Sequence, residues 1–344
     1  MKAKYYIAIM LSFIKYQIVI SQGILSPAGV MISHAHSKGG VMLSYNYMSM
    51  TMKNNRSGTT AVSDEAVWNN YIFAPQDMHM NMHMLMGMYG LTDRLTLMAM
   101  TDYITSTMTL TLPPGTVLNH HHGDSSMVMS TESIHTHATS GFGDIKLWAV
   151  YKLLSDENSS FVFSAGINIP TGKFDIDAGD HAVFEGERHP YMMQLGTGSL
   201  DFMPGLTYLK HNENITWSAQ AFATIRPFFN SIGYHYGSDI TVNVWTSYLI
   251  SSFMSVSARL ESFTGGSIQG SDPNVYSVIE PDANPGSYGG QKVNGYLGTN
   301  FYTDKNFLSN CKIAVEFGIP VYQNLNGTQL AHQYTLNAGI TKTF

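Results

Sequence analysis

Apolar and polar residues alternate with a period of two through most of this 344-residue chain. Successive side chains of a β-strand point to opposite faces, so the alternation predicts strands that meet a different environment on each side. The pattern is clearest in the last segment, where the apolar face would consist of Tyr334, Leu336, Ala338, Ile340 and Phe344. It also predicts strands near 145–151, 161–168 and 312–319. One face of each strand suits lipid, and the other tolerates charge.

The connections between the expected strands alternate between short and long. Short polar turns are expected at 90–94, 154–160, 210–214, 250–252 and 303–310. Longer loops are expected near 53–76, 107–140, 171–199, 226–237, 264–290 and 322–331. Turns at one end, loops at the other and an even strand count are typical of outer-membrane barrels with both chain ends in the periplasm. We therefore predict an all-β fold, a closed antiparallel transmembrane β-barrel of about twelve strands over residues 40–344.

The N-terminus has the pattern of a secretory signal. Lys2 and Lys4 precede an apolar stretch over residues 5–20, and small or polar residues follow it. This order predicts a signal peptide over residues 1–22, and residues 23–39 would form a short periplasmic segment before the barrel. The alternative is a single N-terminal anchor helix.

Composition narrows the possible partners. Charged residues make up 12% of the chain and the formal net charge is −6, with no cluster of Lys and Arg. Nucleic acid is therefore not an expected partner, because nothing would neutralise its phosphates. The single cysteine, Cys311, excludes an intramolecular disulfide framework. The expected location is a bacterial outer membrane, with lipid and a small solute or metal ion as partners; a soluble β-sandwich would leave the low charge unexplained.

Several short motifs distributed from about residue 40 to the end carry a resemblance to a known family. They lie at 89–95 (YGLTDRL), 141–145 (GFGDI), 169–172 (IPTG), 194–199 (QLGTGS), 319–323 (IPVYQ) and 326–330 (NGTQL). In these features the chain resembles the outer-membrane transporter family labelled for the meta-pathway of phenol degradation, and within it a subgroup rich in Met and His. The resemblance implies a barrel channel in a membrane. It does not identify the cargo, because the motifs are rich in Gly, Pro and Thr that mark turns and strand exits.

Methionine and histidine are concentrated in the first part of the chain. Of 22 methionines, 16 lie between Met31 and Met129, and nine of the 14 histidines lie between His34 and His137. Thioether sulfur suits Cu(I) and imidazole suits Cu(II) or Zn, so this inventory favours copper, as Cu(I) or Cu(II), as a cargo rather than as a required cofactor. Met is also a flexible apolar residue that is used freely as filler, which is the alternative explanation.

The strand expected over residues 77–89 leaves its orientation open. Its even positions from 78 to 88 are all methionine, and the opposite face carries His79, His83, Leu85 and Tyr89. If Leu85 and Tyr89 face lipid, the methionines of three neighbouring strands form a wall in the lumen. If the methionines face lipid, His79 and His83 are the lumenal groups. We favour the inward methionine wall, because Leu, Val and Tyr supply the lipid face elsewhere.

The loop after the third expected strand adds a second group of candidate ligands. A mobile loop could wrap an ion with its histidines, although a solvated polar loop is an equally good explanation. The full set of candidate metal ligands is Met48, Met50, Met80, Met82, Met84, Met86, Met88, Met98, Met100, His79, His83, His120, His121, His122, His135 and His137. The lumen would also be lined by Asp144, Lys146, Gln220, Arg226, Arg259, Glu261 and Glu316.

Three functions fit these features. The first is a channel for small solutes with a role in copper or other soft-metal handling. The second is a channel for small hydrophobic or aromatic compounds, and the third is a metal-binding or structural barrel without transport. An enzyme is not expected, because no histidine lies within an expected strand beside a likely catalytic partner and neither G-x-S-x-G nor H-E-x-x-H occurs.

Overall fold

The computed structural model describes residues 25–344 apart from 117, 123–125, 131–133, 180–181 and 304–308, and gives only the backbone of 118–122 and 126–130. The predicted signal peptide lies outside the described residues. The strands of the main sheet are β1 (Val41–Gly58), β2 (Thr60–Val62), β3 (Ala74–Gly90), β4 (Leu95–Thr111), β7 (Ile134–Phe142), β8 (Ile145–Ser155), β9 (Ser159–Ile169), β10 (Asp201–Asn212), β11 (Ile215–Thr224), β13 (Asp239–Ser251), β14 (Met254–Gly265), β16 (Gly290–Thr303) and β17 (Cys311–Thr343). The short elements are α2 (Asp64–Trp68), β5 (Leu118–His122), β6 (Ser126–Ser130), η2 (Tyr191–Met193), β12 (Tyr234–His235), β15 (Gln269–Gly270) and η3 (Pro281–Ala283).

The main sheet closes into an antiparallel barrel. β1 pairs with β3 on one side and with β17 on the other. β7 and β8 pair in turn with β4, so together they make one wall strand with a break at 143–144. β17 changes partner at Leu325: residues 311–325 pair with β16, and residues 325–343 pair with β1. With these two arms counted separately, twelve wall strands lie within the described residues, which confirms the predicted barrel.

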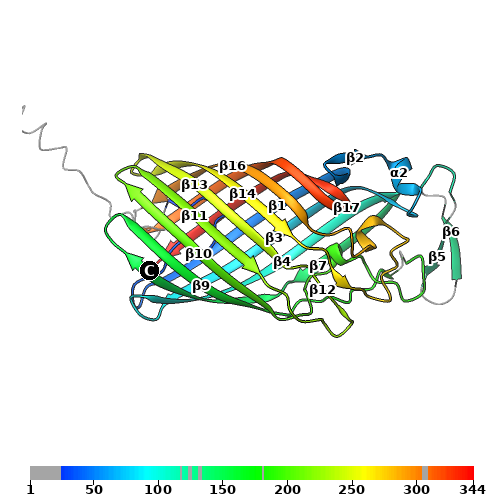
Figure 1. Ribbon diagram of the computed structural model, residues 1–344, viewed down its shortest axis with the longest axis horizontal. Helices are drawn as coiled ribbons and strands as arrows, with labels where there is room; N and C mark the ends of the chain where they lie inside the picture. The colour runs from blue at the N-terminus through cyan, green and yellow to red at the C-terminus, as the bar shows by residue number, and fades with distance from the viewer. Residues whose placement is uncertain (1–24, 117, 123–125, 131–133, 180–181, 304–308) are drawn as a thin grey trace, which may run out of the picture.

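The ends of the barrel differ in the way the sequence predicts. The five connections β3 to β4, β8 to β9, β10 to β11, β13 to β14 and β16 to β17 are short, and the longer loops gather at the opposite end (Figure 1). The C-terminus and the start of the described chain both lie at the short-turn end (Figure 1). That this end faces the periplasm remains a prediction. None of the described helices has the length and apolar character of a membrane-crossing helix.

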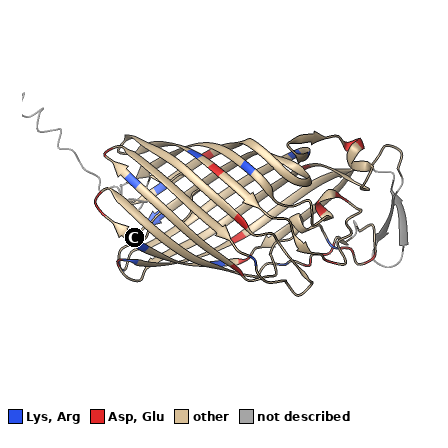
Figure 2. Cartoon of the chain, viewed as in Figure 1, with Lys and Arg blue, Asp and Glu red and all other residues tan. Residues whose placement is uncertain are grey.

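The outer surface of the barrel is apolar. Large exposed side chains on it include Leu43, Leu85, Leu97, Trp217 and Leu297, and Figure 2 shows how few charged residues the wall carries. In hydrocarbon every backbone polar group must find a partner within the protein, and a closed barrel meets that condition. The outward apolar band is therefore the surface that faces lipid.

The segment before β1 lies inside the barrel at its short-turn end. Three inward side chains donate hydrogen bonds to its carbonyl groups: Ser247 to Leu25 (2.6 Å), Lys312 to Ser26 (3.1 Å), and Gln220 to Met31 and Ile32 (2.9 and 3.1 Å). Residues 25–36 therefore lie in the lumen and narrow it, at the end that the sequence predicts to be periplasmic.

The loops at the other end also pack into the lumen. Tyr191 on η2 and Tyr288 contact one another edge-on, and Tyr288 donates a hydrogen bond to the carbonyl of Asp282 on η3 (2.6 Å). Ile72 and Phe73, just before β3, donate backbone hydrogen bonds to the carbonyl groups of Val278 and Ile279. The loop that contains η3 is thereby held against the wall. The lumen is thus narrowed by the N-terminal segment at one end and by loops at the other.

Candidate functional site

The methionines of β3 face the lumen, which resolves the orientation left open by the sequence. Met86 is 9% exposed and Met78 is fully buried, whereas Leu85 is 59% exposed on the outer surface. Tyr89 is also exposed. The preferred orientation is therefore confirmed, because Leu and Tyr supply the lipid face of this strand and sulfur lines the interior.

Strand register aligns these methionines into rows across β1, β3 and β4. Met88 on β3 lies opposite Met42 on β1 and Met98 on β4. The other directly opposed pairs are Met86 with Met100, Met82 with Met48, Met80 with Met50, Met78 with Met52 and Met78 with Met108. Directly opposed residues on one face of antiparallel strands have Cβ atoms about 4.5–5.5 Å apart. Thioethers therefore follow one another along the lumen from one end to the other, and we call this set the methionine rows.

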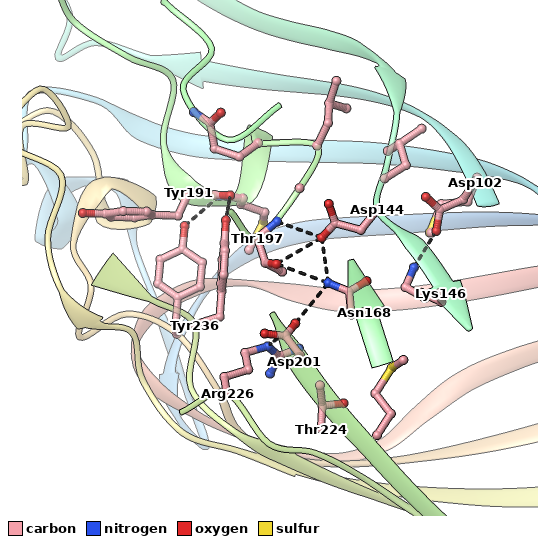
Figure 3. A pocket seen from close by; sticks show the side chains of 18 residues that line it. Asp102, Asp144, Lys146, Asn168, Tyr191, Thr197, Asp201, Thr224, Arg226 and Tyr236 are labelled. Atoms are coloured by element: carbon pink, nitrogen blue, oxygen red, sulfur yellow. Dashed lines mark hydrogen bonds and ion pairs between the residues drawn. The ribbon is translucent and has the colours of Figure 1, made fainter. Parts of the chain in front are cut away.

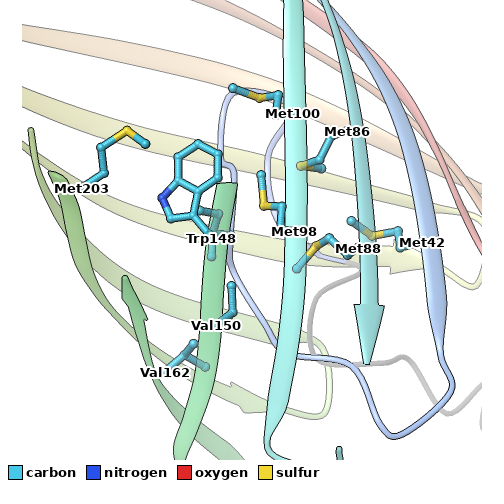
Figure 4. Close-up of a cluster of buried hydrophobic side chains, with 10 residues drawn as sticks. Met42, Met86, Met88, Met98, Met100, Trp148, Val150, Val162 and Met203 are labelled. Carbon is cyan, nitrogen blue, oxygen red and sulfur yellow. The ribbon is translucent and has the colours of Figure 1, made fainter. Parts of the chain in front are cut away.

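Methionines at the short-turn end form a packed group that we call the turn-end cluster. Its buried members are Met42, Met86, Met88, Met98, Met100, Met203, Trp148, Val150, Val162 and Ile32 (Figure 4). Ile32 comes from the N-terminal segment, so that segment packs directly on the methionines. The indole of Trp148 lies against Gly166 on β9, where any side chain would collide with the ring. Glycine at this position therefore lets Trp148 turn into the cluster.

A second group, the loop-end cluster, lies where the loops enter the lumen. Its buried members are Met52, Phe73, Met78, Met108, Leu110, Leu112, Met193, Ile279 and Leu330, with Met50 and Met80 packed at its edge. Met193 and Ile279 come from the inserted loops, so the loops seal this end by apolar contact. Met48 and Met82 lie between the two clusters, and Met84 packs at the edge of the turn-end cluster; all three are only half-buried.

A chamber of about 400 Å³ lies between the clusters. Tyr191, Tyr236 and Tyr288 bound it on the loop side, and Met82 and Met203 contribute thioethers. Figure 3 shows Tyr191 and Tyr236 on one side of the chamber and Asp102 and Lys146 on the other. A solute in the chamber would touch sulfur, phenol rings and charged groups at once.

The charged groups of the chamber are held in a fixed network. Asp102 pairs with Lys146 at 2.8 Å, and Arg226 pairs with Asp201 at 3.5 Å and Asp239 at 2.7 Å. The carboxylate of Asp144 accepts hydrogen bonds from the backbone of Gly172 and Thr197, from the Thr197 hydroxyl and from the Asn168 amide. Elsewhere in the lumen Arg259 makes a two-point contact with Glu316, at 2.9 and 2.8 Å. These contacts confirm the predicted lumenal positions of Asp144, Lys146, Gln220, Arg226, Arg259, Glu261 and Glu316.

Two of the predicted metal ligands lie on the wrong face for a lumenal site. The side chain of His79 is 54% exposed and contacts the Thr51 hydroxyl at 3.1 Å. His83 is exposed and contacts the Tyr45 hydroxyl at 2.7 Å. Because the side chains of a strand alternate, the inward placement of the methionines necessarily turns both histidines outward. His79 and His83 cannot share a site with the methionine rows.

The remaining predicted histidines divide into two groups. His120, His121 and His122 lie on β5, which pairs with β6, and their side chains are outside the described residues. His135 and His137 lie on β7, face inward and are buried. Their rings contact one another edge-on at 5.2 Å, and His137 also contacts the ring of His189 at 4.8 Å.

Two buried acids near these histidines were not predicted from the sequence. Nε2 of His137 lies 3.2 Å from Oε1 of Glu280, and Asp282 is two residues further along the same loop. Burial raises the pKa of Glu280 to about 8, and burial together with the charge of Glu280 raises the pKa of Asp282 to about 8. Among the described residues no three His, Cys, Asp or Glu side chains are placed to hold one metal ion. Any metal site here therefore needs a donor of another kind.

Comparison with known proteins bears on the fold. No family model matches the chain, and no curated protein sequence matches it. In structure it is similar to the COG4313 outer membrane channel from Pseudomonas putida F1, with 18% identity, a TM-score of 0.59, and coverage of 91% of this chain and 98% of that one. A Pseudomonas aeruginosa FadL homologue has 11% identity, a TM-score of 0.44 and coverage of 94% and 96%. The P. putida toluene transporter TodX has 11% identity, a TM-score of 0.40 and coverage of 89% of both chains.

The first of these likenesses agrees with the closed barrel described above. The fold is that of a bacterial outer-membrane channel, and the outer membrane is where a closed barrel with an outward apolar band is stable. At 18% identity the likeness concerns the fold and not the cargo. The resemblance to the phenol-degradation family remains a prediction.

Proposed function

We propose that the chain is an outer-membrane channel for small solutes, rather than an enzyme, and that its cargo is a soft metal ion, Cu(I). The observation that carries the proposal is the set of methionine rows, because directly opposed thioethers follow one another along the lumen. Filler methionines would need no such alignment and would serve equally well on the lipid face. Here the lipid face of β3 carries Leu85 and Tyr89 instead.

Thioethers suit this role because of their charge and softness. A neutral sulfur donor binds Cu(I) in preference to hard cations. Conduction needs sites that are strong enough to attract the ion and weak enough to release it, ideally several in sequence. Rows of methionines at successive positions along β3 supply such a series.

The charge of the chamber also favours a cation. Three carboxylates (Asp102, Asp144 and Asp201) line it, against two cationic side chains, Lys146 and Arg226. Both cations are already paired with carboxylates, so the chamber lining carries more acidic than basic groups. A cation leaving the loop-end cluster would therefore meet attraction rather than repulsion in the chamber.

The test is flux of Ag(I), a redox-stable substitute for Cu(I), into proteoliposomes loaded with a silver-sensitive dye. The informative variant changes Met80, Met82 and Met84 to Leu, which keeps the apolar volume and removes sulfur beside the chamber and at the facing edges of the two clusters. The matched control is Met254→Leu, which lies at the short-turn end of β14 and outside the rows. We expect the triple variant to lose Ag(I) flux and the control to keep it. Equal Ag(I) flux in wild type, the triple variant and the control would refute the soft-metal cargo. Binding of Ag(I) without flux would indicate a metal-binding barrel that does not transport.

A small aromatic compound is the second candidate cargo. The feature that favours it is the wall of phenol rings formed by Tyr191, Tyr236 and Tyr288 on the loop side of the chamber. Aromatic rings pack well edge-on against such a wall. Uptake of a neutral aromatic solute by the same proteoliposomes, unchanged in the Met80, Met82 and Met84 variant, would favour this candidate over copper.

A further inference from the structure

We propose that Met108, His137 and Glu280 bind a copper ion at the loop end of the lumen, ahead of the methionine rows. The proposal rests on the proposed function, because it supplies the first binding site for the same cargo. It also assigns a role to a buried polar group that the rows themselves do not use.

Strand register brings the first two donors together. On the shared face of β4 and β7, Met108 lies directly opposite His137. Met108 also lies opposite Met78 on β3, which in turn lies opposite Met52 on β1. Three thioethers and one imidazole therefore lie side by side across β1, β3, β4 and β7, in the order Met52, Met78, Met108 and His137. All four side chains face inward and are buried.

The third donor comes from the loop that enters the lumen. Oε1 of Glu280 lies 3.2 Å from Nε2 of His137, a separation that two ligands of one metal ion can adopt. The loop is fixed in place by the backbone hydrogen bonds from Ile72 and Phe73 and by the turn in which Ala283 donates to the carbonyl of Glu280. Met108, His137 and Glu280 therefore come from three separate segments that meet at one point.

The environment of Glu280 calls for a cation. Its side chain is 1% exposed, and among the described residues Oε2 has no hydrogen-bond partner. A carboxylate buried without compensation is strongly unfavourable, so the group either keeps a proton or binds a cation.

The donor set matches copper better than other common ions. A thioether is soft, an imidazole is borderline and a carboxylate is hard, so the three together accept copper in either oxidation state. Oxygen-seeking ions such as Ca²⁺ and Mg²⁺ would gain nothing from the sulfur or the imidazole. The edge-on rings of His135 and His189 hold the His137 ring in its orientation. A bound ion would also tie the loop of Glu280 to the barrel wall.

The test is Cu(II) binding to the full-length purified protein in detergent, followed by electron paramagnetic resonance and calorimetric titration. Three variants address the three donors: His137→Gln, Glu280→Gln and Met108→Leu, the last of which preserves apolar packing. His79→Gln is the matched control, because His79 faces outward from the neighbouring strand β3. Folding of each variant is checked by its mobility on gels before and after heating.

We expect wild type and His79→Gln to show nitrogen-coordinated Cu(II) from this site. His137→Gln and Glu280→Gln should weaken its affinity at least about ten-fold, since even the loss of an outer partner of a metal ligand costs that much. Met108→Leu should weaken binding of Cu(I) more than that of Cu(II). Unchanged affinity in any folded variant of His137 or Glu280 overturns the proposal. Absence of Ag(I) flux through the wild-type protein, with copper still bound at this site, would instead refute the channel, so the two failures are distinguishable.

Discussion

The methionines pack with different partners at the two ends of the lumen. At the turn end, methionines pack with Trp148 and with Ile32 of the N-terminal segment. At the loop end, the row through Met108 continues directly into His137 and Glu280. In the proposed function, the same residue type would form part of a mixed copper site at the loop end and a series of thioether sites toward the turn end.

The N-terminal segment at the turn end and the inserted loops at the other end are anchored differently, and this gives the largest expected effect on stability. At the turn end, buried Glu316 pairs with Arg259 and accepts a hydrogen bond from the backbone of Gly29 at 3.0 Å. Glu316→Ala leaves Arg259 buried without its main partner, which should cost about 3–5 kcal/mol. Urea unfolding in detergent, followed by tryptophan fluorescence, measures the loss.

The loop end offers the matched comparison for this change. There Asp272 pairs with Arg188, whose side chain is 21% exposed. Asp272 is 1% exposed, but water reaches the Arg188 side of the pair and Asp272 keeps a hydrogen bond from the backbone of Asn274, so Arg188→Ala should cost less than Glu316→Ala. If Arg188→Ala lowered the free energy of unfolding as much as Glu316→Ala, the N-terminal segment would not be anchored more strongly than the loops.

The stability cost of truncating a methionine should depend on where it lies in the methionine rows. Met78 is fully buried in the loop-end cluster, whereas Met82 lies beside the chamber and is half-buried. Met78→Ala should therefore destabilise the barrel by about 2–5 kcal/mol, the usual cost of a large-to-small change in a core. Met82→Ala should cost clearly less, because its side chain already borders an open volume. Equal losses, measured by the same unfolding assay, would show that the chamber is closed around Met82.

A smaller effect should distinguish the two clusters spectroscopically. Trp148 lies in the turn-end cluster beside Met98 and Met100 (Figure 4), whereas the loop-end cluster has no tryptophan among its described members. Ag(I) bound by the turn-end thioethers should therefore change the fluorescence of Trp148. The change should disappear in Trp148→Phe and in Met98→Leu with Met100→Leu, and it should persist in Met108→Leu. A change that survives Trp148→Phe would place the silver elsewhere.

The smallest expected effect is a pH dependence of the N-terminal segment. Burial, the neighbouring His36 and nearby lysines lower the pKa of His34 to about 3, and burial also lowers the pKa of His36. The docked segment therefore binds fewer protons than the free one, whose histidines titrate near about 6.5. Docking should be fully stable above that value and should weaken as the pH falls from there toward 3. Hydrogen exchange of residues 25–36 should rise at pH 5 in wild type and stay level in a variant with both histidines changed to Gln.

The strands and their faces could be predicted because each depends on local alternation. Leu85 and Tyr89 were enough to favour the inward methionines of β3, and the five short turns lie where polar residues interrupt the alternation. The same rule should have placed His79 and His83 outside the lumen as soon as the methionines were placed inside it. Composition groups these two histidines with the methionines, whereas strand alternation separates them.

The partners of His137 could not be predicted in the same way. Glu280 lies in an irregular loop, and its approach to His137 depends on how Ile72 and Phe73 hold that loop against the wall. The docking of residues 25–36 was missed for a similar reason, because its hydrogen bonds go from strand side chains to main-chain carbonyls. Such contacts leave no pattern in the docked segment itself.

The most direct test of the central claim is X-ray absorption at the copper edge of Cu(I)-loaded His137→Gln protein. In that variant the mixed site at the loop end is removed and the methionine rows remain to bind the ion. We predict a shell of sulfur neighbours around copper, and fewer sulfur neighbours when Met86, Met98 and Met100 are also changed to Leu. Copper surrounded only by nitrogen and oxygen in the His137→Gln protein would contradict a soft-metal path along the lumen.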